Sequence, residues 1–334
     1  MARLVYDASE IGGAMGTGSA CGKAILLGEH AVVYGWPAIA VPLTDLRAHA
    51  TVLDSREPVI EASDLNRVLR YESRARDSDS RALWQMLALA LGACGGSLQS
   101  SPLRVVLQSD VPVARGLGSG TAVATAITRA VADHMRVTLD ADAISEIVFE
   151  SEVLLHGTPS GIDNTVVAWE RPVWFVKGAL PEALSVETPL HLVVGDTGVV
   201  SGTREAVAGV RAARERDRVR VDGIVGDIGE LAGVARGAIL NAGLAKLGVL
   251  MNRNHRLLQE MGVSCPELDR LVIAAREAGA LGAKLSGGGL GGCMVALVTP
   301  GRRQEVASAL RANGASQVYC SSVSVGGCKG GSAC

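Results

Sequence analysis

Aromatic residues, charge of one sign and long apolar runs are all scarce in this chain of 334 residues. Only 3% of the residues are aromatic, so Ala, Val, Leu and Ile must fill most of the core. The net charge is −2, and acidic and basic residues are mixed along the sequence, which gives no field to attract nucleic acid or an anionic membrane. No apolar run reaches the roughly 18 residues that a membrane helix requires. We therefore expect no nucleic-acid partner and no membrane partner.

Cysteine is present but lacks the spacing that would give it a structural role. The seven cysteines are an odd number and include no CxxC pair. This excludes a zinc template and the paired pattern of a secreted, disulfide-rich protein. The first residues lack the basic start and apolar block of a signal peptide. The reducing cytoplasm is the compartment that we expect.

The two common glycine-rich nucleotide motifs are also missing. A Walker A loop needs Lys and then Ser or Thr after its last Gly, but Ala follows Lys23, and Thr17 stands where the earlier Gly is required. A GxGxxG pattern does occur within residues 287–292. An apolar run with strand character follows it, where a dinucleotide-binding fold needs a helix. Neither of these nucleotide folds is therefore expected.

The most informative stretch that the sequence does contain is residues 111–126, VPVARGLGSGTAVATA. A proline-bounded turn opens into a glycine-rich loop, and an alanine-rich run typical of a helix begins at Ser119. Such a loop and helix start offer unpaired backbone N–H groups and the positive end of the helix dipole to an anion, and phosphate is the obvious candidate. Glycine also serves simple tight turns, so the interpretation depends on companions elsewhere in the chain.

Three further segments combine glycine with residues that carry chemistry. Residues 22–35, GKAILLGEHAVVYG, place a lysine before a short apolar strand and a Gly-Glu-His cluster after it. Residues 152–164, EVLLHGTPSGIDN, run from the end of a helical stretch into a glycine-flanked turn that closes on Asp163. Residues 284–293, KLSGGGLGGC, form a glycine loop between two apolar segments.

In the order in which they lie along the chain, these four segments resemble the GHMP kinases, and the resemblance covers the chain from about Ala20 to Val298. It is strongest to the members that phosphorylate mevalonate, on the evidence of residues 28–35, 156–164, 197–210 and 254–271. The resemblance implies an α+β, two-domain GHMP kinase fold, with a ribosomal protein S5 domain 2-like N-terminal domain and a ferredoxin-like C-terminal domain. We place these domains at residues 1–185 and 186–334.

The resemblance also implies a function: an enzyme that uses ATP and Mg²⁺ to phosphorylate the C5 hydroxyl of mevalonate, an early step of isoprenoid biosynthesis. Family habit favours a homodimer. Two alternatives stay open, another enzyme of the family, such as a phosphomevalonate kinase or a diphosphomevalonate decarboxylase, and a non-catalytic sensor with the same fold. The first would need additional cations for the substrate phosphate, which are sparse around Asp163 in the sequence. The second would be expected to lose Lys23 or Asp163, and both are present.

Phosphoryl transfer needs held phosphates, a divalent cation and a group that takes the proton from the attacking hydroxyl. By resemblance, Asp163 is the catalytic base, and Lys23 lies beside it, where its ammonium group stabilises the carboxylate and polarises the substrate hydroxyl. From the residues alone, an Asp beside Gly also commonly accepts hydrogen bonds within its turn, and Lys23 also fits a solvated position after a loop.

Glu152 and Ser119 match the family's magnesium ligands, with the neighbouring Glu150 left open as an alternative to Glu152. Carboxylate and hydroxyl oxygens suit Mg²⁺, which keeps several waters and takes further oxygens from phosphates. One departure bears on this site, because the family loop usually reads GLGSS and its second Ser contributes to the metal site. That position is Gly120 in this chain. Ser119, Thr121 or a water molecule must then supply the hydroxyl.

The remaining site residues follow from the same matches. Those expected to contact mevalonate are Lys23, Glu29, His30, Ser160, Asp163 and Thr203. Those expected to hold ATP, between the two glycine loops, are Arg115, Gly116, Leu117, Gly118, Ser119, Gly120, Thr121, Ser286, Gly287 and Gly288. From the residues alone, His30 also fits a buried structural histidine, and Thr203 also fits the N-cap of the next helix.

Periodicity and helix-breaking residues predict the elements that carry these segments. Strands are predicted over 37–54 and 103–110, and a strand pair over 164–177. Helices are predicted over 80–93, 119–137, 140–156, 203–217, 224–247, 249–261 and 266–279.

Overall fold

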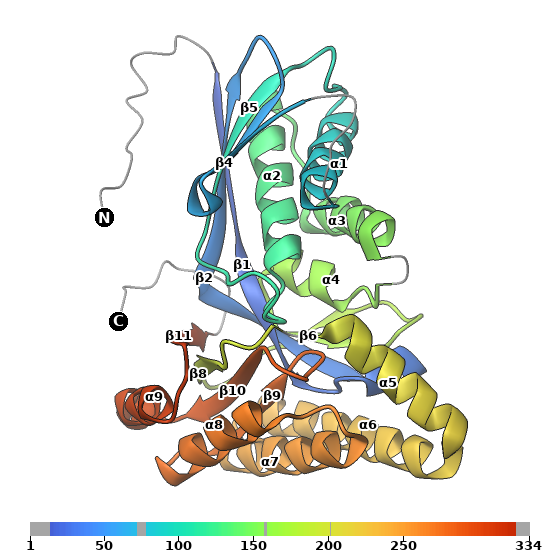
Figure 1. Ribbon diagram of the computed structural model, residues 1–334, viewed down its shortest axis with the longest axis vertical. Helices are drawn as coiled ribbons and strands as arrows, with labels where there is room; N and C mark the ends of the chain where they lie inside the picture. Colours follow the sequence, from blue (N-terminus) through green and yellow to red (C-terminus); the bar gives the residue numbers. More distant parts are fainter. Residues whose placement is uncertain (1–13, 72–77, 157–158, 201, 325–334) are drawn as a thin grey trace.

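The structure is a computed structural model that describes residues 14–71, 78–156, 159–200 and 202–324. Within these ranges the strands form two sheets, which lie one above the other along the long axis of the molecule (Figure 1). The first sheet contains β1 (Met15–Leu27), β2 (Ala38–Asp54), β3 (Val59–Ala62), β4 (Arg67–Arg70), β5 (Leu103–Ser109), β6 (Val173–Phe175) and β7 (Glu182–Ala183). The second contains β8 (Leu190–Asp196), β9 (Gly282–Ser286), β10 (Cys293–Val298) and β11 (Gln317–Val323).

The first sheet is built around the antiparallel pair of its two longest strands, β1 and β2. Its order is β4-β3-β5-β2-β6-β7, with β1 paired to β2, and only the β3–β5 pair is parallel. One short 3₁₀ helix, η2 (Ala31–Tyr34), lies in the connection between β1 and β2, and another, η3 (Ser63–Leu65), joins β3 to β4. The strands predicted over 37–54 and 103–110 are thus confirmed as β2 and β5.

Helices cover one face of this sheet (Figure 1). They are α1 (Ser78–Ala93), α2 (Ser119–Met135), α3 (Ala141–His156) and α4 (Ile162–Trp169). Helix α2 lies directly on β1, because a Cβ atom added to Gly18 would come within 2.3 Å of the carbonyl oxygen of Ala126. Only glycine on the strand, facing small residues on the helix, permits this approach. The packing fixes the middle of α2 against β1.

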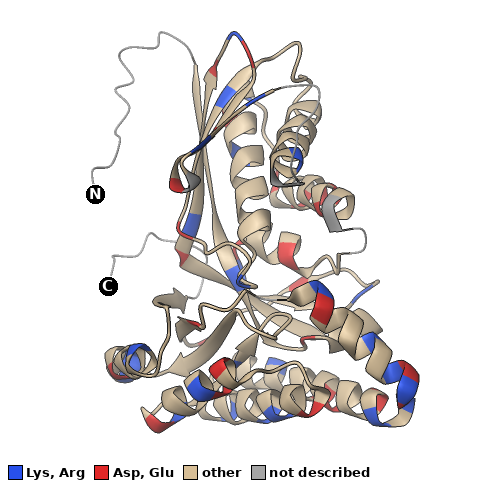
Figure 2. Ribbon diagram, in the orientation of Figure 1, with Lys and Arg blue, Asp and Glu red and all other residues tan. Residues whose placement is uncertain are grey.

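The second sheet is antiparallel throughout, in the order β11-β8-β10-β9. Its helices are α5 (Thr203–Arg216), α6 (Arg218–Leu240), α7 (Leu244–Met261), α8 (Pro266–Glu277) and α9 (Arg303–Ala312), with the 3₁₀ helix η4 (Pro300–Arg302) before the last. Acidic and basic segments are mixed along these helices (Figure 2). The predicted domain boundary, after residue 185, falls between β7 and β8 and stays a prediction.

Two predictions of local structure were wrong. The stretch 164–177 is not a strand pair: its first part belongs to helix α4, which follows Gly161 in a left-handed conformation, and only β6 is a strand. The break predicted near Gly248 lies instead at 241–243, between α6 and α7. Gly248 sits within α7, where a Cβ atom would come within 2.3 Å of the carbonyl oxygen of Leu281. That glycine serves close packing against the strand rather than the end of a helix.

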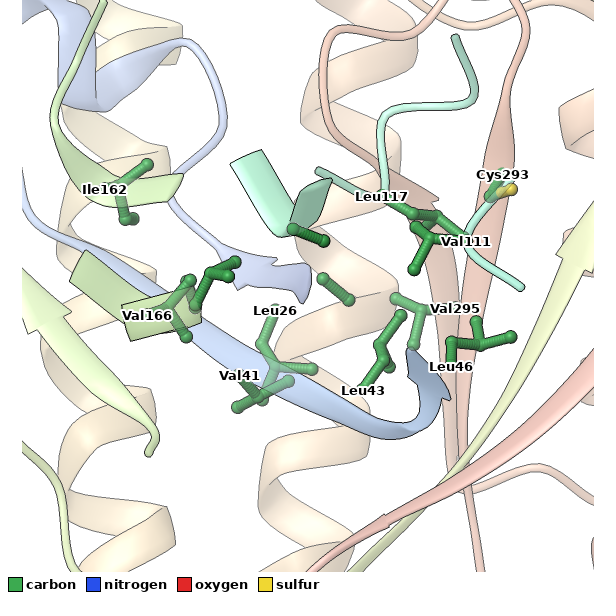
Figure 3. Packing of buried hydrophobic residues seen from close by; sticks show 14 of the residues in the cluster. Leu26, Val41, Leu43, Leu46, Val111, Leu117, Ile162, Val166, Cys293 and Val295 are labelled. Carbon is green, nitrogen blue, oxygen red and sulfur yellow. The ribbon is translucent and has the colours of Figure 1, made fainter. Parts of the chain in front are cut away.

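One hydrophobic cluster extends through both sheets. Leu26 and Val41 of the first sheet and Val295 of the second all belong to it, and Figure 3 shows them close together. Small and branched aliphatic side chains dominate the cluster, as the scarcity of aromatic residues predicts. In the described part of the chain, no helix is both long and apolar enough to cross a membrane.

Candidate active site

The glycine-rich loop before α2 has the geometry of an anion-binding segment. Gly116 and Gly118 have φ angles of 78° and 74°, in the left-handed region that favours glycine. Helix α2 begins at Ser119, and no side chain caps its N-terminus at Gly118. The first N–H groups of this long helix are therefore open to a ligand, and the positive end of the helix dipole favours a negative charge there.

Lys23 and Asp163 form an ion pair beside this loop. Their Nζ and Oδ1 atoms are 3.1 Å apart, although the residues come from β1 and from the first turn of α4. The backbone N–H of Lys23 donates to the carbonyl oxygen of Leu117, at 2.9 Å, and a Cβ atom on Gly118 would lie 3.0 Å from Cγ of Lys23. The lysine side chain is 4% exposed and the aspartate side chain 36%. The structure thus places a partly open carboxylate and a buried ammonium group next to the anion-binding loop.

Glu152 contacts the first turn of the same helix. The hydroxyl of Thr121 donates to its Oε1 atom, at 2.9 Å. A Cβ atom on Gly120 would meet nothing within 4 Å, so the missing serine leaves open space. Of the hydroxyls that the sequence offered, the one on Glu152 is that of Thr121. Among the described residues, no three or more His, Cys, Asp or Glu side chains are grouped so that they could hold a metal ion, so a cation here would complete its coordination with phosphate oxygens and water.

The second glycine loop, residues 287–292, packs against the first. A Cβ atom on Gly116 would lie 3.3 Å from the carbonyl oxygen of Ser286, and one on Gly288 would lie 2.7 Å from Cα of Thr203, the first residue of α5. The hydroxyl of Ser286 is buried and accepts the N–H of Ile25, at 3.0 Å. Its side chain anchors the loop, so any contact of Ser286 with ATP would come from its backbone.

Two other predicted residues have identified partners, and a third is buried. Arg115 pairs with Asp196 at the end of β8, with 3.2 Å between Nε and Oδ2. The hydroxyl of Ser160 accepts the N–H of Ile162, at 3.4 Å, and so helps to set the turn before α4. The side chain of Leu117 is fully buried in the core, which leaves only its backbone for a ligand.

Glu29 and His30 have other polar partners than Asp163 does. Glu29 is 1% exposed, pairs with Lys284 and accepts a hydrogen bond from Asn254, at 3.2 Å. Nε2 of His30 lies 2.9 Å from the carbonyl oxygen of Gly288 and must donate to it. Burial lowers the pKa of His30, the charge of Lys284 adds to the effect, and the hydrogen bond to Gly288 opposes it. The ring is therefore neutral at pH 7.

Sequence reasoning did not select Lys284, Asn254 or Asp196. Lys284 carried a signal, since it is one lysine in an otherwise apolar strand, and a buried charge needs a partner. The partner comes from a distant segment, Glu29, and only the packing of the two sheets identifies it.

Two family models match the chain, "GHMP kinases N terminal domain" over residues 81–170 and "GHMP kinases C terminal" over residues 235–316. The mevalonate kinase of Pyrococcus horikoshii is 40% identical over 312 residues, which cover 89% of this chain and 92% of that protein. That of Aeropyrum pernix is 32% identical over 289 residues, 85% of this chain and 88% of the relative. The structure of L. major mevalonate kinase in complex with R-mevalonate has a TM-score of 0.82 at 26% identity and covers 98% of this chain and 100% of its own.

Proposed function

The chain belongs to the GHMP kinase family, and we propose that it catalyses the ATP-dependent phosphorylation of the C5 hydroxyl of mevalonate. Its similarity to mevalonate kinases over most of its length supports the substrate. The observation that carries the chemistry is the Lys23–Asp163 pair at 3.1 Å, beside an uncapped helix N-terminus. A base and an anion site lie together there, as transfer of a phosphoryl group to an alcohol requires.

In the proposed reaction, the C5 oxygen of mevalonate forms a bond to the γ-phosphorus of ATP while the bond to the β,γ-bridging oxygen breaks. Asp163 takes the proton of the attacking hydroxyl, and ADP leaves with the bridging oxygen. Lys23 stabilises the negative charge that develops near Asp163. The N–H groups at the start of α2 and the surrounding glycine loop hold the phosphates, which is mainly positioning and electrostatic stabilisation.

We propose that Glu152, with the hydroxyl of Thr121 or Ser119, holds a magnesium ion on the phosphates. The hydrogen bond between Thr121 and Glu152, at 2.9 Å, and the oxygen character of the set fit a hard divalent cation. When bound, Mg²⁺ neutralises phosphate charge and so makes the phosphorus accessible to a nucleophile. The chain's own part is to hold one carboxylate beside the loop.

We further propose that the protein works in the cytoplasm. Cys94 and Cys293 are buried free thiols, which supports a reducing compartment. A homodimer stays a prediction.

The test is an ADP-release assay with ATP and Mg²⁺ in which mevalonate, phosphomevalonate, homoserine and galactose are offered separately. Turnover with mevalonate alone, and mevalonate 5-phosphate as the product by ³¹P NMR, is the expected result. Turnover with phosphomevalonate instead would replace the proposed substrate while leaving the reaction class intact. Absence of turnover with all four substrates would overturn the proposed activity.

A further inference from the structure

A line of polar contacts joins β9 and the loop after it to the end of β1 and the turn that follows. On the β9 side, the contacts come from the side chains of Lys284 and Ser286, two residues apart on the strand, and from the carbonyl oxygen of Gly288 in the loop. We call this set the polar seam; its members are Lys284, Ser286 and Gly288 on one side and Ile25, Glu29 and His30 on the other.

Lys284 is the centre of the seam. Its side chain is fully buried, and its ammonium group donates to the carboxylate of Glu29 and to the carbonyl oxygens of Leu285 and Ile25. A lysine has three N–H donors, and all three have acceptors here. Asn254 of α7 donates to the second carboxylate oxygen of Glu29, at 3.2 Å. The position of Glu29 is therefore fixed from two elements of the second half of the chain.

The residue after Glu29 has a strained backbone. His30 has φ 61° and ψ −42°, a combination that residues other than glycine rarely adopt. Such a conformation persists only where the surroundings hold it in place. Here Glu29 is held by Lys284 on one side, and the ring of His30 is held by the carbonyl oxygen of Gly288 on the other.

The seam also connects with the catalytic lysine. Lys23 lies two residues before Ile25 on β1, and Ile25 receives hydrogen bonds from both Lys284 and Ser286 on its carbonyl oxygen, at 3.4 and 3.3 Å. The hydroxyl of Ser286 also accepts the N–H of Ile25. One buried set of contacts thus fixes the strand end that carries Lys23 and the turn that carries His30.

We propose that Lys284 is a positioning residue for the phosphoryl transfer: acting through Glu29, it holds His30 in its strained conformation against Gly288. Because Nε2 of the ring donates to the carbonyl oxygen, Nδ1 is left as an acceptor, and its chemistry suits a hydroxyl of the substrate. Glu29 then shapes the mevalonate site without contacting the substrate. This inference rests on the proposed function for the identity of that substrate.

A purely structural seam would stabilise the fold and leave substrate binding unchanged. The double variant Glu29→Gln/Lys284→Met distinguishes the two roles, because it removes both charges together and leaves neither of them buried alone. Its matched control is Glu61→Gln/Arg104→Met, which removes a partly buried ion pair between β3 and β5, with Nε and Oε1 2.9 Å apart. Both proteins are compared with the unaltered chain for melting temperature, kcat and the two KM values.

We expect the seam variant to raise KM for mevalonate roughly 10- to 100-fold, as loss of positioning does, while KM for ATP changes less than about threefold. The control variant keeps both KM values. Should the double variant fold poorly, Asn254→Leu removes only one hydrogen bond to Glu29 and is expected to raise KM for mevalonate in the same direction, by a smaller factor. The proposal would be overturned if the seam variant and Asn254→Leu both had the same KM for mevalonate as the unaltered protein.

A second readout does not depend on turnover. Long-range ¹H–¹⁵N spectra of histidine-labelled protein report the tautomer of His30, which is assigned by its loss in His30→Gln. We expect the Nε2–H tautomer in the unaltered chain and its loss in the seam variant. Absence of turnover with mevalonate in the unaltered protein would contradict the proposed function. The His30 signals would still test the role of Lys284 in that case. Unchanged signals in the seam variant would overturn it.

Discussion

Two lysine–carboxylate pairs with the same chemistry lie in contrasting surroundings in this molecule. In the open pair, Lys23 with Asp163, the aspartate side chain is 36% exposed. In the sealed pair, Lys284 with Glu29, the side chains are 0% and 1% exposed. The carboxylate of Asp163 is open to solvent, whereas Glu29 is held from two sides by protein donors. Under the proposed mechanism, burial rather than residue type separates the reactive pair from the positioning pair.

Asp163→Asn gives the largest effect expected on the open side. The amide keeps the shape of the side chain but cannot take the proton of the attacking hydroxyl, so kcat is expected to fall by about 10²- to 10⁴-fold. The melting temperature is also expected to fall, because the buried ammonium group of Lys23 loses its counter-charge. Steady-state kinetics with mevalonate and differential scanning calorimetry measure both quantities. A variant that retained most of the turnover would show that Asp163 is not the base.

Replacing each lysine by methionine tests the contrast in stability directly. Lys284→Met leaves the carboxylate of Glu29 buried without its counter-charge, and the free energy of unfolding is expected to fall by about 3–5 kcal/mol. Lys23→Met leaves Asp163, which can turn toward water, and the expected loss is below about 1 kcal/mol. Urea denaturation at pH 7 measures both losses. Equal losses in the two variants would remove the distinction between the open and the sealed pair.

Sequence patterns located the open pair better than the sealed pair. Lys23 and Asp163 each stand in a motif with glycine neighbours, and the family resemblance alone brought them together. Lys284 lies in an apolar strand, and its partner is far away in the chain, so its role depends on how the two sheets pack. The same limit explains the error at 164–169, where β-branched and aromatic residues favour a strand in isolation. Tertiary packing against α3 and the glycine before α4 make it a helix instead.

Acid is expected to lower the free energy of unfolding through His255, a residue of α7 that contacts β9 next to the polar seam. Nδ1 of its ring accepts the N–H of Leu285, at 3.3 Å, and Nε2 lies 3.2 Å from Asp269. Burial lowers the pKa of His255 to about 4, against 6.5 in an unfolded chain. The unfolded state therefore binds a proton first as the pH falls.

The contribution of His255 to the free energy of unfolding should accordingly be present in full above pH 6.5. It should fall by about 2–3 kcal/mol between pH 6.5 and about 4. Urea denaturation across the interval, compared between the unaltered chain and His255→Gln, measures the contribution. If the two proteins have the same slope of unfolding free energy against pH, His255 is not the group responsible.

The smallest expected effect concerns the proposed metal site near the open pair. The usual serine is missing there at Gly120, and the neighbouring Thr121 supplies a hydroxyl. Thr121 donates to Glu152, while Gly120 leaves open space. Thr121→Ala removes one hydrogen bond to a charged group, and the Mg²⁺ concentration for half-maximal ATP binding is expected to rise about five- to tenfold. The double variant Gly120→Ser/Thr121→Ala should recover most of this loss, because a serine side chain has room at residue 120. Fluorescence titration of a labelled ATP analogue with Mg²⁺ measures the shift without turnover. If the added serine does not restore Mg²⁺-dependent ATP binding, the hydroxyl of Thr121 serves the packing of α2 against α3 instead. In that case a hydroxyl at residue 120 cannot replace it, although the space beside Gly120 is open.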